Sequence, residues 1–206
     1  MRISKKKFIY LISPNNIYPK FYQDLKKVLE TGKVGLFQLR LKKYPFKQKI
    51  LIGKKIHLIC KKYKVKFLVN DDPILSKKLN ADGCHLGQKD MSIAEARKIV
   101  GSKIIGITCH NSINLAKAAI RDKANYIAFG AFFSTKTKNV KFRATSKILN
   151  KANKLTKIPI VAIGGININN YKKLLLNNAN LLAISSYVWN NKKYKPLEAI
   201  EKLNEN

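Results

Sequence analysis

Residues 35–69 read GLFQLRLKKYPFKQKILIGKKIHLICKKYKVKFLV, and this stretch contains the unit from which the fold is predicted. Two short apolar runs, Gly35 to Leu39 and Phe67 to Val69, have the length and the polar boundaries of buried strands. The longer segment between them has an apolar stripe at helical spacing, formed by Ile52, Ile56, Ile59 and Tyr63. Because such a helix covers one face of a parallel sheet, the stretch predicts a β, α, β unit.

The same order of apolar run and amphipathic segment recurs along the chain. The six further runs are residues 8–12, 83–86, 104–108, 126–129, 160–163 and 181–184. Eight strands that alternate with helices predict an α/β protein with a closed (β/α)8 TIM barrel, and 206 residues lie near the lower limit of about 200 for this fold. A doubly wound open sheet is the alternative. Since no linker, repeat or low-complexity block interrupts the chain, we expect one domain over residues 1–206.

The formal net charge of +31 comes mostly from lysine. Such an excess is typical of nucleic-acid-binding proteins and of proteins that handle anionic substrates. The lysines are spread over every segment and no nucleic-acid-binding motif is present, so we expect no specific nucleic-acid partner. We favour a compositional bias toward Lys, Asn and Ile as the cause of the charge. A basic surface would still attract a diphosphate substrate.

The start of the chain and the cysteines indicate where the protein is found. The apolar stretch Phe8 to Ile12 is shorter than the roughly 7 to 15 residues of a signal-peptide core, and no run approaches the ~20 apolar residues of a membrane span. The spacing of cysteines and histidines fits neither a disulfide framework nor a metal site; they are Cys60, Cys84, Cys109, His57, His85 and His110. We expect a soluble, cytoplasmic protein with buried thiols, structural histidines and no membrane partner. Nothing in the sequence indicates an oligomeric state.

In a barrel of this kind the chemistry lies at the carboxyl ends of the strands, so the polar residues that follow each apolar run are candidates for the site. After the second run, Gln38, Arg40 and Lys42 alternate and therefore point to the same side of an extended segment. A solvated edge would explain one lysine. Three polar groups on one side of a barrel mouth favour the binding of an anion.

Residues 70–73, NDDP, follow the third run. Asp72 as N-cap and Pro73 at the first helical position fit a helix start. Asn70 and Asp71 then have no capping role, and a carboxylate at a strand end is a reasonable Mg2+ ligand.

Residues 87–95, GQKDMSIAE, follow the fourth run, and Ser92 with Glu95 fits a capping box. Asp90 is therefore also left without a capping role. Asp71 and Asp90 end adjacent predicted strands and face the cations that follow the second run. Two carboxylates for the metal and cations for the phosphate oxygens are what a diphosphate bound through Mg2+ requires.

Hydroxyl, ammonium and glycine groups follow the last four runs. They are Thr108 after the fifth run, Thr135, Lys136, Thr137 and Lys138 after the sixth, Gly164 and Gly165 after the seventh, and Ser185 and Ser186 after the eighth. A solvated, flexible loop is the alternative for the sixth group, above all for Lys136. The loops after strands seven and eight commonly form the phosphate site of TIM barrels, because glycine lets backbone N–H groups approach the anion.

Six motifs at these strand ends resemble, in order, those of the thiamine-phosphate synthase family, which also includes a thiazole tautomerase branch. The motifs are QLRLK (38–42), FLVNDDP (67–73), ADGCHLGQKDM (81–91), GITCHN (106–111), YIAFGAFFSTKTK (126–138) and VAIGGI (161–166). The resemblance covers about residues 8 to 188. It implies a TIM barrel that acts on small-molecule substrates with Mg2+.

The resemblance also implies roles for residues that match the motifs. The pyrimidine diphosphate would be bound by Gln38, Leu39, Arg40, Leu41, Lys42, Asn70, Thr108 and Lys138, and the thiazole phosphate by Thr135, Lys136, Thr137, Gly165, Ser185 and Ser186. Asp71 and Asp90 would be the Mg2+ ligands, and Arg40, Lys42 and Lys138 the catalytic cations. The implied reaction is dissociative: pyrophosphate leaves, a pyrimidine methyl cation forms, and the thiazole nitrogen captures it.

Three departures from the family pattern affect the thiazole half more than the diphosphate half. Thr108 replaces a serine, the residues after Lys138 lack the usual glycine, and Ser185 replaces an apolar residue. The nearest rival function is the tautomerase, in which His110 would transfer a proton. An isomerase has no physical need for two free carboxylates and three cations at one mouth, so the motifs favour the synthase. A nucleic-acid-binding protein is the more remote alternative.

Overall fold

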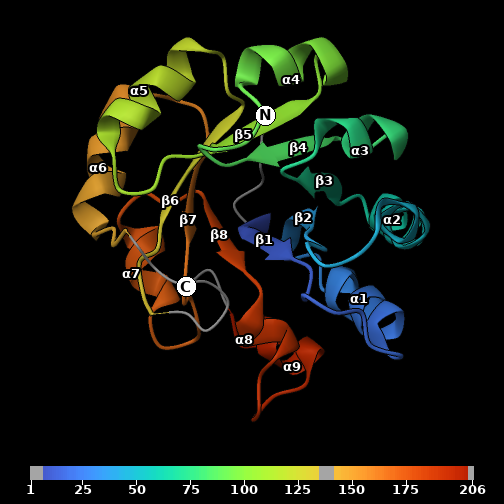
Figure 1. Cartoon of the computed structure of the whole chain (residues 1–206). Helices are drawn as coiled ribbons and strands as arrows, with labels where there is room; N and C mark the ends of the chain where they lie inside the picture. The colour runs from blue at the N-terminus through green and yellow to red at the C-terminus, as the bar shows by residue number, and fades with distance from the viewer. Residues whose placement is uncertain (1–6, 135–141, 204–206) are drawn as a thin grey trace.

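The computed structural model describes residues 7–134 and 142–203, and its strands close into a barrel (Figure 1). All neighbouring strands are parallel and follow chain order, and β1 closes the sheet by pairing with both β2 and β8. The strands are β1 (Ile9–Ile12), β2 (Val34–Leu39), β3 (Lys66–Asn70), β4 (Gly83–Leu86), β5 (Ile104–Thr108), β6 (Tyr126–Gly130), β7 (Ile160–Ile163) and β8 (Leu181–Ile184). The predicted (β/α)8 barrel is confirmed, and the open doubly wound sheet is wrong.

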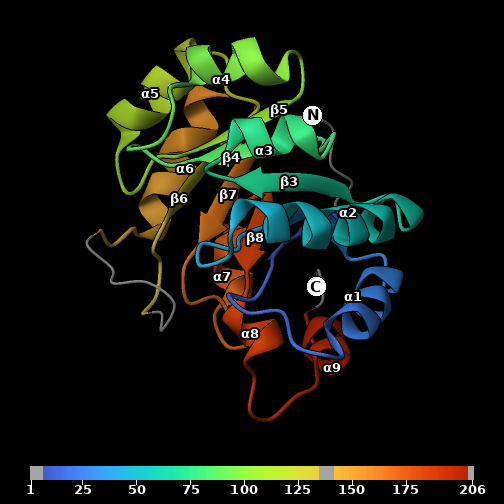
Figure 2. The same cartoon turned by 45° about the vertical axis from the view of Figure 1, so that its right-hand side comes forward.

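Helices cover the outside of this barrel (Figures 1 and 2). They are α1 (Phe21–Glu30), α2 (Phe46–Lys62), α3 (Pro73–Lys78), α4 (Ile93–Val100), α5 (Ile113–Arg121), α6 (Ser146–Leu155), α7 (Tyr171–Leu176), α8 (Ser186–Trp189) and α9 (Pro196–Glu201). Two expected helix starts are confirmed. The Asp72 side chain accepts a hydrogen bond from Leu75 N at 2.8 Å and caps α3, with Pro73 in its first turn. Ser92 and Glu95 form the capping box of α4.

The strand side chains alternate between two apolar cores, because successive residues of a strand point to opposite faces of the sheet. One core lies between the sheet and the helices. The other fills the barrel interior and consists of Tyr10, Ile12, Leu36, Leu68, Tyr126, Ala128, Val161, Leu181 and Ala183. Gly106 on β5 makes room for Tyr126, since a Cβ at this position would overlap the tyrosine ring. The interior is therefore a packed core with its opening only at the strand ends.

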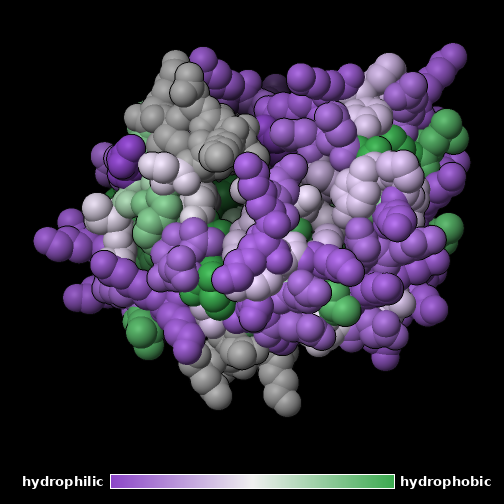
Figure 3. Space-filling model, turned by 90° about the horizontal axis from the view of Figure 1, so that it is seen from below, coloured by the Kyte–Doolittle hydropathy of each residue, from purple (hydrophilic) through white to green (hydrophobic). Residues whose placement is uncertain are grey.

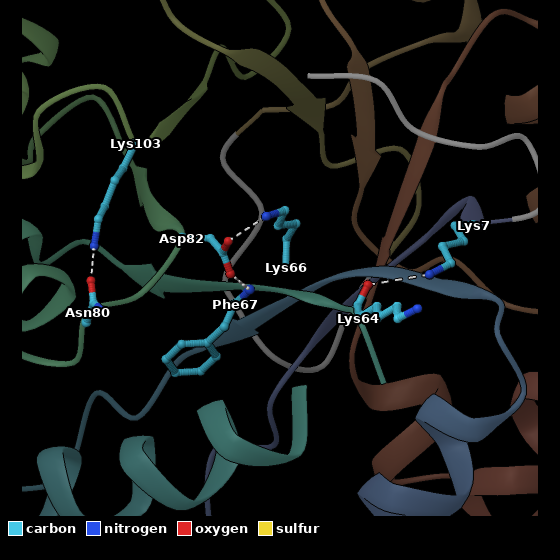
Figure 4. A network of polar contacts seen from close by, with 7 residues as sticks. All are labelled: Lys7, Lys64, Lys66, Phe67, Asn80, Asp82 and Lys103. Carbon is cyan, nitrogen blue, oxygen red and sulfur yellow. Dashed lines mark hydrogen bonds and ion pairs between the residues drawn. The ribbon is translucent and has the colours of Figure 1, made fainter. Parts of the chain in front are cut away.

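A polar network joins the amino ends of β3, β4 and β5 (Figure 4). Asp82, just before β4, accepts hydrogen bonds from Lys66 Nζ at 2.8 Å and from Phe67 N at 2.9 Å. Lys103 Nζ, just before β5, donates to Asn80 Oδ1 at 2.6 Å. These bonds tie neighbouring strands together at the end of the barrel that carries no predicted site residue.

The surface reflects the composition. On the face that Figure 3 shows, hydrophilic residues dominate and apolar residues form separate small patches. This agrees with lysines that are spread over every segment of the chain. In the part of the chain that the structure describes, no helix combines the length and the apolar character needed to cross a lipid bilayer.

Candidate active site

Gln38 and Arg40 continue the alternation of β2 into the barrel mouth. The Gln38 side chain lies inside the barrel, only 2% exposed, and its Nε2 donates to the Tyr10 hydroxyl. Arg40 is half-buried, and its Nη1 donates to Asn15 Oδ1 at 3.0 Å. Burial lowers the pKa of Arg40, and the charge of Asp71 opposes that shift. The guanidinium therefore lies within electrostatic reach of Asp71.

Lys42 and Asp71 form an ion pair at the mouth. Lys42 Nζ lies 3.0 Å from Asp71 Oδ2, and the two side chains are 55% and 31% exposed. Asp71 has a φ of 62°, and its backbone N donates to His85 O at 2.8 Å, which fixes the residue at the turn that follows β3. Because water reaches both partners, the pair can open when another anion or cation arrives.

Asp71 and Asp90 share a hydrogen bond between their carboxyl groups. Burial alone would raise the pKa of Asp71, but the bonds from Lys42 and Asp90 and the lysine charge bring it below its usual value. Burial and the neighbouring Asp71 charge raise the pKa of Asp90, against a bond from Gly87 that lowers it. The two carboxyl groups therefore titrate as a pair in which Asp90 binds a proton more readily than Asp71.

Asp90 takes no part in the cap of α4, as expected, but it has another structural contact. Asp90 Oδ2 accepts a hydrogen bond from Gly87 N at 2.7 Å, because the tight loop after β4 leaves this backbone donor without a strand partner. The bond uses only one side of the carboxylate. Asp90 thus closes its own loop and still faces Asp71.

Two neighbouring carboxylates fit a divalent cation, which would relieve their repulsion. Among residues 7–134 and 142–203, no group of three or more His, Cys, Asp or Glu side chains could hold a metal ion. Mg2+ commonly binds through one or two carboxylates and completes its shell with water and substrate phosphate. Asp71 and Asp90 therefore suit a metal that arrives with a diphosphate, and do not form a closed protein cage.

A cavity of about 440 Å³ opens beside this pair, between the ends of β2 and β3 and the helices α2 and α3. Lys42, Asn70 and Asp71 line it. Leu39 and Leu41 also line it, but their side chains are 2% and 4% exposed and belong to the outer apolar core. Only the backbone of these two leucines is available for a polar contact with a ligand.

The end of β5 is joined to the barrel interior through His85, which is only 7% exposed. Its Nε2 lies 2.8 Å from Thr108 Oγ1, and its Nδ1 lies 2.8 Å from the Tyr126 hydroxyl. The Gln88 amide donates to Thr108 O. Of these residues, Thr108 was predicted as a site residue and His85 as a structural histidine. The position of His85 two residues before the GQKD residues was a signal that could have identified it.

The loops after β6, β7 and β8 bring together some of the residues that were predicted to bind the thiazole phosphate. Gly165 has a φ of 65°, and a Cβ there would overlap the carbonyl oxygen of Ser134. The loop after β6 therefore packs directly on the glycine turn after β7. Ser185 Oγ donates to Ser13 O at 3.2 Å, and Ser186 begins α8. Three members of this group, Thr135, Lys136 and Thr137, lie outside the described residues, and so does Lys138 of the pyrimidine-diphosphate group.

Comparison with known proteins supplies the family context for this geometry. The family model described as thiamine monophosphate synthase matches residues 9–188. The chain is 67% identical over 199 residues to a thiamine-phosphate synthase of Pelagibacter ubique (strain HTCC1062), with 96% of each chain covered. It is 40% identical over 196 residues to a thiamine-phosphate synthase of Erythrobacter litoralis (strain HTCC2594), with 93% of this chain and 92% of the relative covered.

Solved structures agree with the barrel. A thiamine phosphate pyrophosphorylase from Pyrococcus furiosus superposes with a TM-score of 0.85 at 30% identity, covering 97% of this chain and 95% of that one. An orotidine 5'-phosphate decarboxylase from Pyrococcus horikoshii OT3 superposes with a TM-score of 0.64 at 10% identity, covering 93% and 95% of the two chains. The second likeness concerns the fold alone.

Proposed function

Since the chain belongs to the thiamine monophosphate synthase family and is an enzyme of the transferase class, we propose that it joins a pyrimidinylmethyl diphosphate to a phosphoethyl thiazole, or its carboxylated form. The products are thiamine phosphate and pyrophosphate, with CO2 if the thiazole carries the carboxylate. The observation that carries this proposal is the contact of Lys42, Asp71 and Asp90 at the barrel mouth. Cations for phosphate oxygens and paired carboxylates for a metal suit a diphosphate leaving group.

Asp71 and Asp90 would hold Mg2+, which supplies Lewis-acid stabilisation of the charge on the departing pyrophosphate. Among the protein's own residues, the ion pair between Lys42 and Asp71 acts first in the proposed reaction. When the diphosphate binds, Lys42 is released to a phosphate oxygen, and the carboxylate of Asp71 becomes free on the side that the lysine occupied. The partial exposure of both side chains supports this exchange.

Arg40, Lys42 and Lys138 would stabilise the leaving group. The bond between the pyrimidine methylene carbon and the bridging oxygen breaks, and its electron pair leaves with pyrophosphate. The thiazole nitrogen then donates its lone pair to the methylene cation and forms the new C–N bond. No protein nucleophile is needed, so the rate depends on charge stabilisation and on placing the nitrogen in line.

The remaining predicted residues would hold the two rings and the second phosphate. Gln38, Asn70 and Thr108 lie at the ends of β2, β3 and β5, where they would contact the pyrimidine diphosphate. The glycine turn at Gly165 with Ser185 and Ser186 would bind the thiazole phosphate, together with Thr135, Lys136 and Thr137. The free, buried thiols of the three cysteines support a cytoplasmic location for the enzyme.

The test is a comparison of two reactions of the purified protein. With the pyrimidine diphosphate and the thiazole phosphate, we expect release of pyrophosphate and formation of thiamine phosphate in equal amounts. With the carboxylated thiazole alone, we expect no isomerisation. Isomerisation without pyrophosphate release would contradict the proposal and favour the tautomerase reaction.

A further inference from the structure

Five side chains form a continuous chain of hydrogen bonds from the barrel interior to its mouth. Gln38 Nε2 donates to the Tyr10 hydroxyl, which lies 2.8 Å from the Tyr126 hydroxyl. Tyr126 OH lies 2.8 Å from His85 Nδ1, and His85 Nε2 lies 2.8 Å from Thr108 Oγ1. The two ends, Gln38 and Thr108, are residues of the proposed pyrimidine half of the site. The middle three have no role in the proposed chemistry.

The Gln38 amide nitrogen is a donor at one end of this series, and it fixes which atom donates in each of the other hydrogen bonds. Burial raises the pKa of Tyr10 and of Tyr126 well above the ordinary value, so each hydroxyl keeps one proton to donate. Tyr10 accepts from Gln38 and therefore donates to Tyr126. Tyr126 in turn donates to His85 Nδ1. His85 Nδ1 is then an acceptor, so the ring donates from Nε2 to Thr108 Oγ1.

The opposite direction requires the opposite amide orientation of Gln38. If His85 Nδ1 carried a proton, it would donate to the Tyr126 hydroxyl, and Tyr126 would have to donate to Tyr10. The Tyr10 proton would then face the Gln38 amide hydrogen and have no acceptor. Tyr10 is only 1% exposed, and a buried donor without an acceptor is costly. A reversed chain is satisfied only when Gln38 turns its oxygen toward Tyr10. The Gln38 orientation and the His85 tautomer are therefore coupled through the two tyrosines.

We propose that Tyr10 and Tyr126 are positioning residues, which lock the Gln38 amide and the His85 tautomer in one matched arrangement. In this arrangement Gln38 keeps its carbonyl oxygen for a donor of the ligand, and Thr108 keeps its hydroxyl proton for an acceptor. The site thereby selects a heteroaromatic ring with a donor at one position and an acceptor at another. This inference rests on the proposed function, in which the pyrimidine is that ring.

The hydrogen bonds of Gln38 support the inference that its carbonyl oxygen is available to a ligand. Among the residues that the structure describes, the Tyr187 hydroxyl is the only buried side-chain N or O atom without a hydrogen-bond partner. Gln38 Oε1 is not among such atoms and forms no hydrogen bond with the described residues, so it is not fully enclosed by the protein. The amide thus uses its nitrogen for Tyr10 and keeps its oxygen for a donor of the ligand.

The test is the tautomer of His85, read from the ring-nitrogen shifts of the 15N-histidine-labelled protein. The chain has three histidines, so the signals can be assigned by substitution. We expect a pyrrole-type Nε2 and a pyridine-type Nδ1 at His85 in the wild type, without any substrate. Gln38→Glu at alkaline pH places an acceptor-only carboxylate beside Tyr10 and should move the His85 proton to Nδ1. Tyr10→Phe should interrupt this effect, while Tyr63→Phe, at the opposite end of the barrel, should not.

Kinetics provide a second readout. We expect Tyr10→Phe and Tyr126→Phe each to lower kcat/KM for the pyrimidine diphosphate about tenfold, which is the effect of losing one hydrogen bond. The loss should appear as a higher KM for this substrate. The KM for the thiazole phosphate should stay at the wild-type value. Phe keeps the ring packing between the two tyrosines, so both variants should fold.

Either readout can overturn the inference. A His85 tautomer that does not respond to Gln38→Glu contradicts the coupling, whether or not the protein makes thiamine phosphate. Equal losses for both substrates in Tyr126→Phe contradict the selective role. If the tautomer moves as expected but no thiamine phosphate forms, the proposed function fails and the positioning role of the tyrosines stands.

Discussion

Lys42 Nζ lies 3.0 Å from the Asp71 carboxylate, so a proposed phosphate-binding cation is held by a proposed metal ligand. The same carboxylate shares a hydrogen bond with Asp90. Each contact keeps a charged group in position before the substrates bind. Preorganised charge of this kind is the main contribution a protein can make to a reaction without a protein nucleophile.

Loss of the Asp71 carboxylate should reduce turnover strongly. We expect Asp71→Ala to lower kcat by a factor of about 100 or more, the usual effect of removing one preorganised electrostatic group. Asp122→Ala is the matched control, because Asp122 forms an exposed ion pair with Arg121 at the end of α5. Steady-state pyrophosphate release measures both variants. Near wild-type turnover in Asp71→Ala would exclude Asp71 from the mechanism.

Lys138 should have an effect of similar size. We expect Lys138→Ala to lower turnover on the order of 100-fold, because one of the cations on the leaving group is lost. Lys117→Ala removes an exposed lysine of α5 and should leave turnover unchanged. If both variants lose the same activity, the effect comes from the general positive charge of the protein and not from a contact of Lys138.

The affinity for Mg2+ should fall as the pH falls. The pKa of Asp90 is raised by burial and by Asp71, so Asp90 keeps a proton at pH values where an ordinary aspartate is ionised. The metal must displace this proton, whereas Asp71, whose pKa is lowered, stays ionised. Titration of the activity with Mg2+ at several pH values measures the effect. Asp90→Asn should weaken binding at every pH and abolish the dependence, and a wild-type midpoint that is independent of pH would argue against a raised pKa of Asp90.

The polar network at the amino ends of the strands should affect stability and not catalysis. We expect Asp82→Ala to lower the free energy of unfolding by about 1–2 kcal/mol, because Phe67 N loses its acceptor. The exposed pair of Arg121 and Asp122 contributes at most about 0.5 kcal/mol, so Asp122→Ala serves as the control here too. Denaturant unfolding measures both. A large loss of turnover in folded Asp82→Ala would contradict a purely structural role.

Local sequence rules predicted most of the fold. Four of the eight expected strands have the observed bounds, three differ by one residue at one end, and the third strand differs by one residue at each end. Short apolar runs closed by polar residues indicate buried strands directly, and the capping residues Asp72 and Ser92 mark the helix starts. These features depend on neighbours in the sequence, which is why they could be recognised there.

The contacts within the site depend on closure of the barrel and could not be predicted in this way. Tyr10 and Tyr126 are 116 residues apart, and tyrosines in apolar runs are not distinguishable from core residues. The bond from Gly87 to Asp90 was missed because the loop geometry decides which backbone donor lacks a partner. The ion pair of Lys42 with Asp71 requires the register of β2 against β3.

The most direct measurement is a crystal structure of the protein soaked with Mn2+ and pyrophosphate, with anomalous data recorded at the manganese edge. We expect one anomalous peak between Asp71 and Asp90 that contacts the pyrophosphate, with Lys42 moved from Asp71 to a phosphate oxygen. A manganese site elsewhere, or pyrophosphate bound with the Lys42–Asp71 pair intact and no metal at the two aspartates, would contradict the proposed diphosphate site.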